Sequence, residues 1–251
     1  MKALILAAGR GRRLAPHSGE RNKCMLPMFG RPLIEYSLEN AVRAGASEIV
    51  VVVSYRAEQI INAYGIEYGG VRVQYVLQEE PQGLVHAIEC SEEAISGEDF
   101  MLFLADEILW APRHAEMVRK FQAEALTVIC GVVKEPNPEE IRKTYAVIED
   151  DRDQRIYRLI EKPRNPPNQI RGTGNCIFRS RIFDYVPLVP INQNRQEREL
   201  PDLIQCAIDD GLAVKSFDIG EGYVNINTPE DIEVAERTHA GRFRQAPRGR
   251  R

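Results

Sequence analysis

Long hydrophobic runs are missing from this sequence. Apolar stretches such as residues 49–53 and 126–133 are much shorter than the roughly 20 residues that a membrane-spanning helix needs. The N-terminus begins with a strand-like pattern at Lys2 and shows no charged leader followed by an apolar core, as a secretory signal would. We therefore expect a cytoplasmic protein with no membrane partner.

Paired cysteines are missing too. The five cysteines are odd in number, widely scattered and without the spacing of metal ligands. They are Cys24, Cys90, Cys130, Cys176 and Cys206. This pattern indicates neither a disulfide framework nor a zinc site, and it predicts that most of the cysteines are reduced packing residues. Cys24 lies beside Lys23, whose charge favours the thiolate, but we expect a packing role for this cysteine as well.

The sequence also lacks an excess of positive charge. Its 251 residues carry a formal net charge of −4, which argues against nucleic acid as the main partner. Arginines do gather in residues 239–251, a segment without a periodic apolar face, so we expect a basic disordered tail there. Residues 1–238 are long enough to form one large α/β domain.

Strand and helix patterns alternate along the first part of the chain. Apolar strand patterns at residues 2–6, 48–53 and 71–77 are separated by amphipathic helix patterns at 33–43 and 57–64. Such a βαβαβ order predicts a mainly parallel sheet with right-handed crossovers and flanking helices.

Strand patterns follow one another more closely in the second part. We expect strands at residues 145–149, 156–161 and 172–178, then a helix over 197–210 and a strand over 213–217. Short connections favour antiparallel pairing. The predicted fold class is therefore α/β: a Rossmann-like mixed, mainly parallel sheet flanked by helices, with a small antiparallel patch.

The most informative segment follows the first strand. Residues 6–14 read Leu-Ala-Ala-Gly-Arg-Gly-Arg-Arg-Leu, and glycines at such a place let backbone N–H groups approach a polyphosphate. Arg12, Arg13 and Lys23 add positive charge. A Walker loop would need Gly-Lys followed by Ser or Thr, and a dinucleotide fingerprint would need a third glycine opening a helix. We therefore predict a different, long and basic phosphate-binding loop that stays irregular until about Leu33.

The motifs resemble, in their order, those of the sugar-1-phosphate nucleotidylyltransferases, or NDP-sugar pyrophosphorylases, and among them the glucose-1-phosphate thymidylyltransferase-like proteins. The first matching motifs are residues 6–14 and Lys-Cys-Met-Leu-Pro at 23–27, and the resemblance covers roughly residues 2–237. Such enzymes join a nucleoside triphosphate to a sugar 1-phosphate and release pyrophosphate. The resemblance implies that Arg13 steadies the developing charge and that Lys23 grips the phosphates.

The same resemblance implies how the nucleotide is held. Residues 78–84 match the segment that reads the base, with Gln78 pairing with the base edge and Gly83 letting the base lie against the backbone. Gln78 suits thymine or uracil, which favours dTTP or UTP, but an amide can rotate to read other edges, so CTP and GTP stay open. The implied nucleotide-binding residues are Leu6, Ala8, Gly9, Gly11, Gln78, Pro81 and Gly83.

A carboxylate ends the apolar strand pattern of residues 100–106. Open α/β sheets bind ligands at the carboxyl ends of their strands, and one carboxylate together with substrate phosphates can anchor Mg²⁺. We therefore expect Asp106 to bind the metal and Glu107 to be a loop charge. The resemblance implies a second ligand at Asn225, where most relatives have aspartate, and an amide oxygen is a weaker, neutral ligand.

Two further segments are implied to hold the acceptor. Glu-Lys-Pro at residues 161–163 resembles the sugar-phosphate clamp, and the strand at 173–178 matches the one under the sugar. The antiparallel patch would thus carry the acceptor site. The implied sugar-phosphate residues are Glu161, Lys162, Gly174 and Asn175, and the implied catalytic residues are Arg13, Lys23 and Lys162.

The expected reaction needs no protein nucleophile, because the sugar phosphate itself attacks the α-phosphorus and positive charges offset the repulsion. Its partners are the two substrates, and the resemblance also allows a homo-oligomer. Alternatives stay open: a transferase that uses CTP or GTP with another acceptor, a catalytically weak regulatory homologue, or a glycosyltransferase. The Asp-Arg-Asp of residues 151–153 has the metal spacing of the last class, but we interpret it as a hairpin tip.

Overall fold

The computed structural model describes residues 1–14 and 21–243 of the chain. Parallel strands form the centre of its sheet, as the alternation of strand and helix patterns predicts. They are β1 (Lys2–Leu6), β4 (Ile49–Val53), β6 (Val71–Leu77) and β7 (Phe100–Leu104). The chain builds the sheet outward from β1 through β4 to β6 and then returns to place β7 on the other side of β1.

Helices cover both faces of this sheet. They are α2 (Ile34–Arg43), α3 (Ala57–Tyr64), α4 (Leu84–Cys90), α5 (Glu92–Ile95), α6 (His114–Ala123) and α8 (Leu200–Asp209). Side chains of β1 alternate between the faces: Leu4 lies in one apolar core with residues of α4 and α8, and Ile5 lies in a second with residues of α2 and α6. Because β4 is buried on both faces, it can consist of one isoleucine and four valines.

The antiparallel patch is formed by β10 (Tyr145–Glu149), β11 (Ile156–Glu161) and β12 (Ile170–Phe178). The predicted bounds of the first two strands are confirmed, and residues 151–153 lie in the turn between them. β12 joins the patch to the parallel strands because it pairs with β10, with β7 and with β9 (Val128–Lys134).

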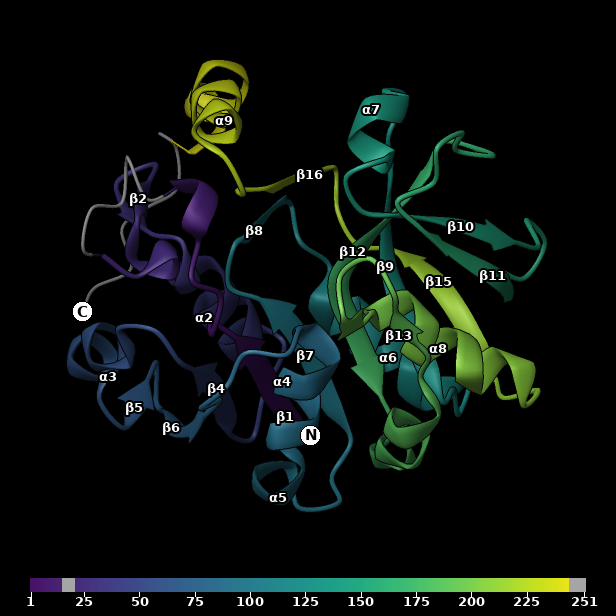
Figure 1. Cartoon of the computed structure of the whole chain (residues 1–251), viewed down its shortest axis with the longest axis horizontal. Helices are drawn as coiled ribbons and strands as arrows, with labels where there is room; N and C mark the ends of the chain where they lie inside the picture. The colour runs from purple at the N-terminus through teal and green to yellow at the C-terminus, as the bar shows by residue number, and fades with distance from the viewer. Residues whose placement is uncertain (15–20, 244–251) are drawn as a thin grey trace.

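The described residues place ten strands in the main sheet (Figure 1). Their order is β11-β10-β12-β7-β1-β4-β6-β5, where β5 (Glu67–Tyr68) is an edge strand, and β9 with its parallel partner β15 (Val214–Asp218) joins through β12. The predicted mixed, mainly parallel sheet with an antiparallel patch is therefore confirmed.

A separate two-stranded ribbon lies between the parallel strands and the patch in Figure 1. It pairs β8 (Glu107–Trp110) with β16 (Gly222–Asn225), in antiparallel orientation. Helix α9 (Pro229–Phe243) follows, and the Thr228 hydroxyl accepts a hydrogen bond from the Asp231 N–H at 3.3 Å, as expected for a helix N-cap. Residues 239–243 of the predicted tail are helical, and residues 244–251 lie outside the described part of the chain.

The helix predicted over residues 197–210 begins later than expected. Glu197 and Arg198 form β14, which pairs with β13 (Ile191–Asn192) in a small hairpin, and α8 starts at Leu200 with Pro201 in its first turn. The remaining short elements are η1 (Arg12–Leu14), η2 (Lys23–Met25), β2 (Pro27–Met28), β3 (Arg31–Pro32), α7 (Pro138–Ile141) and η3 (Ser180–Leu188).

The cysteines are free thiols in the structure. Cys24 is buried against the sheet, and burial, with a further contribution from the charge of Asp106, raises its pKa to about 12 against the lowering effect of Lys23. The packing role expected for Cys24 is thus confirmed. Within residues 1–14 and 21–243, no helix has the length and apolar character needed to cross a membrane.

Candidate active site

The loop after β1 lies at the point where the strand order reverses. The Ala7 N–H donates to the Val52 carbonyl at 2.8 Å, and the Ala105 N–H donates to the Leu6 carbonyl at 3.1 Å. These bonds hold the loop between the carboxyl ends of β4 and β7. Open α/β sheets bind their ligands at such a switch point, so the fold places the predicted phosphate loop where a ligand is expected.

The glycines of this loop make close approach feasible. Gly11 has φ +59°, and a Cβ built on it would lie 2.7 Å from the Lys23 Cβ, so the backbone rests directly on that lysine side chain. Gly9 is exposed, and a Cβ there would meet nothing within 4 Å. Ala8 is buried and Leu6 is half-buried, so these two position the loop from below.

A cluster of charged and amide groups lies beside the loop. The Lys23 ammonium donates to Asp106 Oδ2 at 2.5 Å and to Asn227 Oδ1 at 3.0 Å. Arg13 Nη2 donates to the same amide oxygen at 3.3 Å. Three residues singled out from the sequence, Arg13, Lys23 and Asp106, are therefore brought together, and Asn227, which sequence reasoning missed, connects them.

One predicted metal ligand, Asp106, lies in the turn between β7 and β8, and the other, Asn225, lies on β16 beside it. β16 pairs with β8 so that Asn225 lies opposite Glu107, and the Ile226 N–H donates to the Asp106 carbonyl at 2.9 Å. Asn225 Oδ1 accepts a hydrogen bond from Asn227 Nδ2 at 2.5 Å. The described residues hold no group of three His, Cys, Asp or Glu side chains able to bind a metal, so an ion at this strand end would need other oxygen ligands as well.

Glu107 is not the loop charge that the sequence suggested. It begins β8 and is only 5% exposed. Its carboxylate accepts hydrogen bonds from the Gly174 N–H at 3.0 Å, from Asn175 Nδ2 at 2.9 Å and from the Tyr223 hydroxyl at 2.6 Å. Burial, and then the charge of Asp106, raise the pKa of Glu107, against the lowering effects of the Tyr223 and Gly174 hydrogen bonds and of the Arg171 charge. The earlier interpretation was wrong because pairing with β16 turns this residue inward.

The buried polar chain continues through Asn175 to His114. The Asn175 amide oxygen lies 2.8 Å from His114 Nε2, and burial lowers the pKa of His114 to about 4, so the imidazole is neutral and its Nε2–H donates. Asn175 is 4% exposed, and both ends of its amide are engaged within the protein. A direct contact of this side chain with an acceptor sugar stays a prediction.

The predicted base-reading segment follows β6. Gln78 is 2% exposed, and its Nε2 lies 2.8 Å from His86 Nδ1 and 3.3 Å from the Gly83 carbonyl oxygen. Gly83 has φ +95°. A Cβ built on it would lie 2.9 Å from the Cβ of Glu197 on β14, so there is no room for a side chain here. Pro81 is exposed in the loop between them. His86 was not found from the sequence, because a histidine early in a helix carries no distinguishing pattern.

The predicted sugar-phosphate clamp lies at the end of β11. Lys162 has φ +43° and its Nζ lies 3.5 Å from Glu161 Oε1. Arg195 lies equally close to that oxygen, at 3.5 Å, and pairs with Glu199 at 2.7 Å. Burial, and then the charge of Glu199, raise the pKa of Glu161 to about 7 against the lowering effects of Lys162 and Arg195. Arg195 is a second cation here that sequence reasoning missed.

The pKa of Glu161 predicts a pH dependence. Its carboxylate exists mainly above about pH 7, so the KM for an acceptor sugar phosphate should rise as the pH falls below that value. The pKa of Glu161 is higher in the folded protein than in the unfolded chain, so the folded state binds more protons between these two values. The contribution of Glu161 to the free energy of unfolding should therefore fall as the pH rises from about 4.5 to about 7. KM and thermal unfolding measured across this range, for the wild type and Glu161→Gln, check both effects.

Glu161→Gln is the informative comparison because titration of the substrate phosphate is common to both proteins. An acidic limb in KM that survives unchanged in the variant would assign it to another group.

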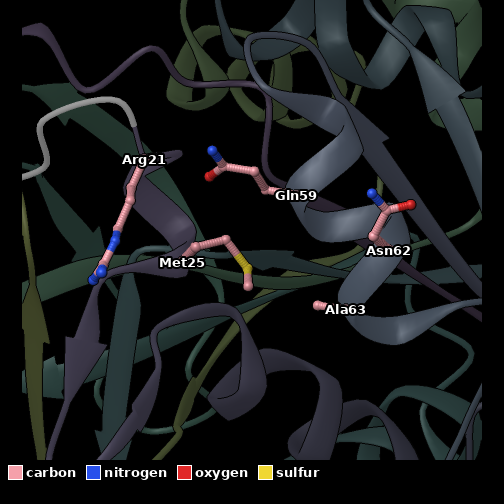
Figure 2. Close-up of a pocket in the computed structure, with 5 residues that line it drawn as sticks. All are labelled: Arg21, Met25, Gln59, Asn62 and Ala63. Atoms are coloured by element: carbon pink, nitrogen blue, oxygen red, sulfur yellow. The ribbon is translucent and has the colours of Figure 1, made fainter.

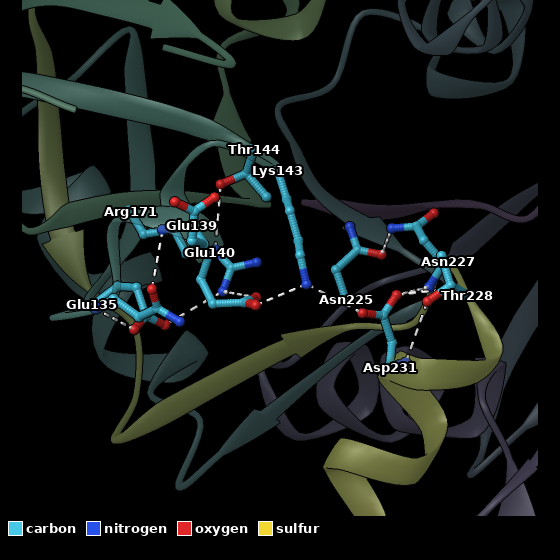
Figure 3. A network of polar contacts seen from close by, with 11 residues as sticks. Glu135, Glu139, Glu140, Lys143, Thr144, Arg171, Asn225, Asn227, Thr228 and Asp231 are labelled. Carbon is cyan, nitrogen blue, oxygen red and sulfur yellow. Dashed lines mark hydrogen bonds and ion pairs between the residues drawn. The ribbon is translucent and has the colours of Figure 1, made fainter. Parts of the chain in front are cut away.

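A second polar network joins the patch to the start of α9 (Figure 3). Arg171 Nη1 contacts Glu140 at 3.3 Å, Glu140 accepts from Lys143 at 2.7 Å, and Lys143 reaches Asp231 at 3.3 Å. Asp231 in turn accepts the Asn227 and Thr228 N–H groups at 2.9 Å each. The network therefore links the antiparallel patch to the segment that carries Asn227.

A surface pocket of about 550 Å³ lies between the segment around η2 and helix α3 (Figure 2). It is lined by Arg21, Met25, Gln59, Asn62 and Ala63. None of these was predicted to bind substrate. The cluster of Arg13, Lys23, Asp106 and Asn227 at the switch point is thus separate from this pocket.

A basic glycine loop and an acidic strand end at the switch point are typical of α/β proteins that bind nucleotides. Comparison with known families gives the same class: residues 2–238 match the family model described as nucleotidyl transferase. The chain belongs to the nucleotidyl transferase family and is a nucleotidyltransferase.

Individual relatives share most of the chain. It is 36% identical over 236 residues to the UTP–glucose-1-phosphate uridylyltransferase AglF of Haloferax volcanii, a match that covers 94% of this chain and 95% of that protein. It is 30% identical to a glucose-1-phosphate thymidylyltransferase of Streptomyces griseus, over 86% of this chain but 59% of the relative. A solved UDP-glucose pyrophosphorylase complexed with UDP-glucose shares the fold, with a TM-score of 0.85, 22% identity and coverage of 96% and 98%.

Proposed function

We propose that this enzyme joins a nucleoside triphosphate, preferably UTP or dTTP, to a sugar 1-phosphate and releases pyrophosphate. The observation that carries the proposal is the convergence of Lys23, Asp106 and Asn225 at the switch point, directly beside the strand that carries Gly174. The names of its relatives, which are glucose-1-phosphate uridylyl- and thymidylyltransferases, support it. The proposed location is the cytoplasm.

The nucleotide would lie along the ends of β1 and β6. The glycine loop with Arg13 and Lys23 would hold the triphosphate through backbone N–H groups and charge. Because Gln78 turns its NH₂ group toward His86 and the Gly83 carbonyl, its amide oxygen is the group left to meet a base. An oxygen acceptor matches the N3–H of uracil or thymine and opposes the unprotonated N3 of cytosine.

The acceptor would lie over the antiparallel patch. Lys162, with Arg195 close by, offers positive charge for the sugar phosphate, and Glu161 offers an acceptor for sugar hydroxyl groups. Gly174 would help to hold the sugar indirectly: a Cβ there would lie 2.2 Å from the Leu104 Cγ, so only glycine lets β12 pack this closely on Leu104 below the proposed acceptor site.

A divalent metal ion fits the donors at the strand end. The Asp106 carboxylate and the Asn225 amide oxygen are oxygen ligands of the kind that a hard cation prefers, and the turn that carries Asp106 lies beside the end of β16 that carries Asn225. We propose Mg²⁺, held by Asp106, Asn225 and substrate phosphates. The ion would neutralise phosphate charge and polarise the α-phosphoryl group.

The residues of the chain supply position and charge rather than a nucleophile. Two anionic substrates repel each other strongly at reacting distance in a partly dry site. Lys23 and Arg13 on one side and Lys162 on the other offset this repulsion, and the two sheet segments hold the attacking oxygen in line with the leaving pyrophosphate.

Pyrophosphate release from a matrix of nucleoside triphosphates and sugar 1-phosphates, with Mg²⁺, tests the proposed function directly. We expect activity with UTP or dTTP, and we expect Lys23→Ala and Asp106→Ala each to abolish it. Activity confined to CTP or GTP would overturn the base preference alone. No turnover with any pair, while nucleotide sugars still bind, would replace the proposal by a regulatory binding role.

Gly9→Ala should separate nucleotide binding from folding. The new Cβ meets no protein atom within 4 Å, so unfolding free energy should change by less than about 0.5 kcal/mol. The methyl group would occupy the exposed face where phosphates approach, so the KM for the triphosphate should rise by roughly tenfold, the worth of one lost charge-assisted hydrogen bond. An unchanged KM for the triphosphate would remove Gly9 from the binding loop.

A further inference from the structure

Glu107 is a buried carboxylate to which the proposed reaction assigns no role. It is 5% exposed, and three groups from two other strands donate hydrogen bonds to it. Oxygen Oε1 takes the Tyr223 hydroxyl and the Gly174 N–H, and Oε2 takes Asn175 Nδ2 and the same N–H. With its lone pairs so engaged, this carboxylate faces protein donors rather than a ligand.

One set of these bonds holds an irregular part of β12. The register between β12 and β9 shifts between Gly172 and Cys176, so the intervening residues leave the regular ladder. The Gly174 N–H, 3.0 Å from each oxygen of Glu107, is satisfied by that carboxylate instead of by a neighbouring strand. The segment proposed to lie under the acceptor sugar is therefore fixed by Glu107.

The other bond holds β16. The Tyr223 hydroxyl donates at 2.6 Å, and Tyr223 is also covered by the Arg171 guanidinium, 4.6 Å above its ring centroid. Asn225 lies two residues further on, opposite Glu107 in the ribbon. Among the described residues β16 pairs with β8 and with no other strand, so the Tyr223 bond adds a side-chain contact to a ladder of four residue pairs.

We propose that Glu107 is a positioning residue that holds the acceptor strand β12 and the metal-binding strand β16 in one fixed relative placement. The inference rests on the proposed function, since it assigns the acceptor to one strand and the metal to the other. Glu107 touches neither substrate. It acts because a single side chain bonds to both strands next to Asp106.

The test compares three variants. Glu107→Gln keeps the size of the side chain but turns one oxygen into a donor that faces other donors. Tyr223→Phe removes only the bond to β16. Glu48→Gln is the control, because Glu48 pairs with Lys2 at 3.0 Å near the opposite, amino ends of the strands. Thermal unfolding is measured for each, together with kcat, the KM of each substrate and the half-saturating Mg²⁺ concentration.

In Glu107→Gln, the KM for the sugar phosphate and the half-saturating Mg²⁺ concentration should both rise at least about tenfold, as loss of hydrogen bonds to a charged group predicts, with the KM for the triphosphate nearly unchanged. In Tyr223→Phe, only the Mg²⁺ requirement should rise, by about fivefold. Glu48→Gln should alter stability alone. If Glu107→Gln lowers the melting temperature like the control but moves neither constant, the residue is merely structural and the inference is wrong.

A measurement independent of turnover separates this inference from the proposed function. Hydrogen exchange of backbone amides should accelerate in Glu107→Gln at residues 172–176 and 222–226 together, by at least about tenfold, and in neither segment of the control. If only one segment loosens, or none, the coupling is refuted whatever reaction the enzyme catalyses. If both loosen but the wild type releases no pyrophosphate, the proposed function fails and the link between the strands stands. Tyr223→Phe, which should loosen 222–226 alone, supplies the result if Glu107→Gln does not fold.

Discussion

Replacing Lys23 by methionine should lower kcat by roughly 10²- to 10³-fold, the usual effect of removing one group that stabilises transition-state charge. The Lys23 ammonium lies at the strand end, 2.5 Å from Asp106 and 3.0 Å from Asn227. Methionine has an unbranched stem of similar length, which retains the packing beneath Gly11. The change therefore removes the charge and its hydrogen bonds to Asp106 and Asn227 but retains the packing.

Pyrophosphate release at saturating substrate concentrations, together with the melting temperature, checks this expectation. Lys215→Met is the matched control. Lys215 lies on β15, and its ion pairs are with Glu124 at 2.9 Å and Asp153 at 4.0 Å, neither of which belongs to the proposed site. The control should keep its kcat. A fall of less than about threefold for Lys23→Met would mean that the lysine serves only to balance Asp106 and has no part in charge stabilisation.

Gly172→Ala should be the most damaging change to folding. A Cβ at this position would lie 1.9 Å from Cε2 of the Tyr145 ring, which is buried and anchored by a hydrogen bond from its hydroxyl to the Thr173 carbonyl at 2.8 Å. Because neither the ring nor the strand backbone can move freely, overpacking should cost about 3 kcal/mol of unfolding free energy, which corresponds to a melting temperature lower by about 10 °C.

Denaturant unfolding measures this loss, and a second substitution gives the physical control. Tyr145→Leu creates space at the clash, so the double variant should be less destabilised than the sum of the two single variants. Gly9→Ala, which meets no neighbouring atom, should unfold at the wild-type denaturant concentration. If Gly172→Ala unfolds at the same denaturant concentration as the wild type, β12 and the Tyr145 ring can move apart at little cost in free energy, and the prediction is wrong.

The parts of this structure that could be predicted are those whose pattern is local and repeated. The run of valines in β4 and the amphipathic face of α3 each carry their signal within a few residues, and both elements lie where the sequence places them. The carboxylate at the end of β7 could be placed for the same reason, since a strand end in an open sheet has a known position.

The parts that could not be predicted depend on pairing between distant segments. The strands of the β8–β16 ribbon are too short to show a period, and Glu107 becomes buried because Gly174, Asn175 and Tyr223, all distant in the sequence, enclose it. The β13–β14 hairpin has two residues in each strand, too few to show a pattern, so the predicted helix wrongly includes the residues of β14. Arg195 and His86 owe their importance to the groups beside them, and no local pattern records that.

The late position of β16 in the sequence has a consequence for synthesis of the protein. Residues up to about 178 contain every strand of the main sheet except β15, so much of the fold can form while the ribosome is still translating. Asn225 and Asn227 emerge only afterwards, and the cluster at Asp106 lacks both until they do. A nascent chain can therefore be largely folded yet still lack a complete catalytic centre.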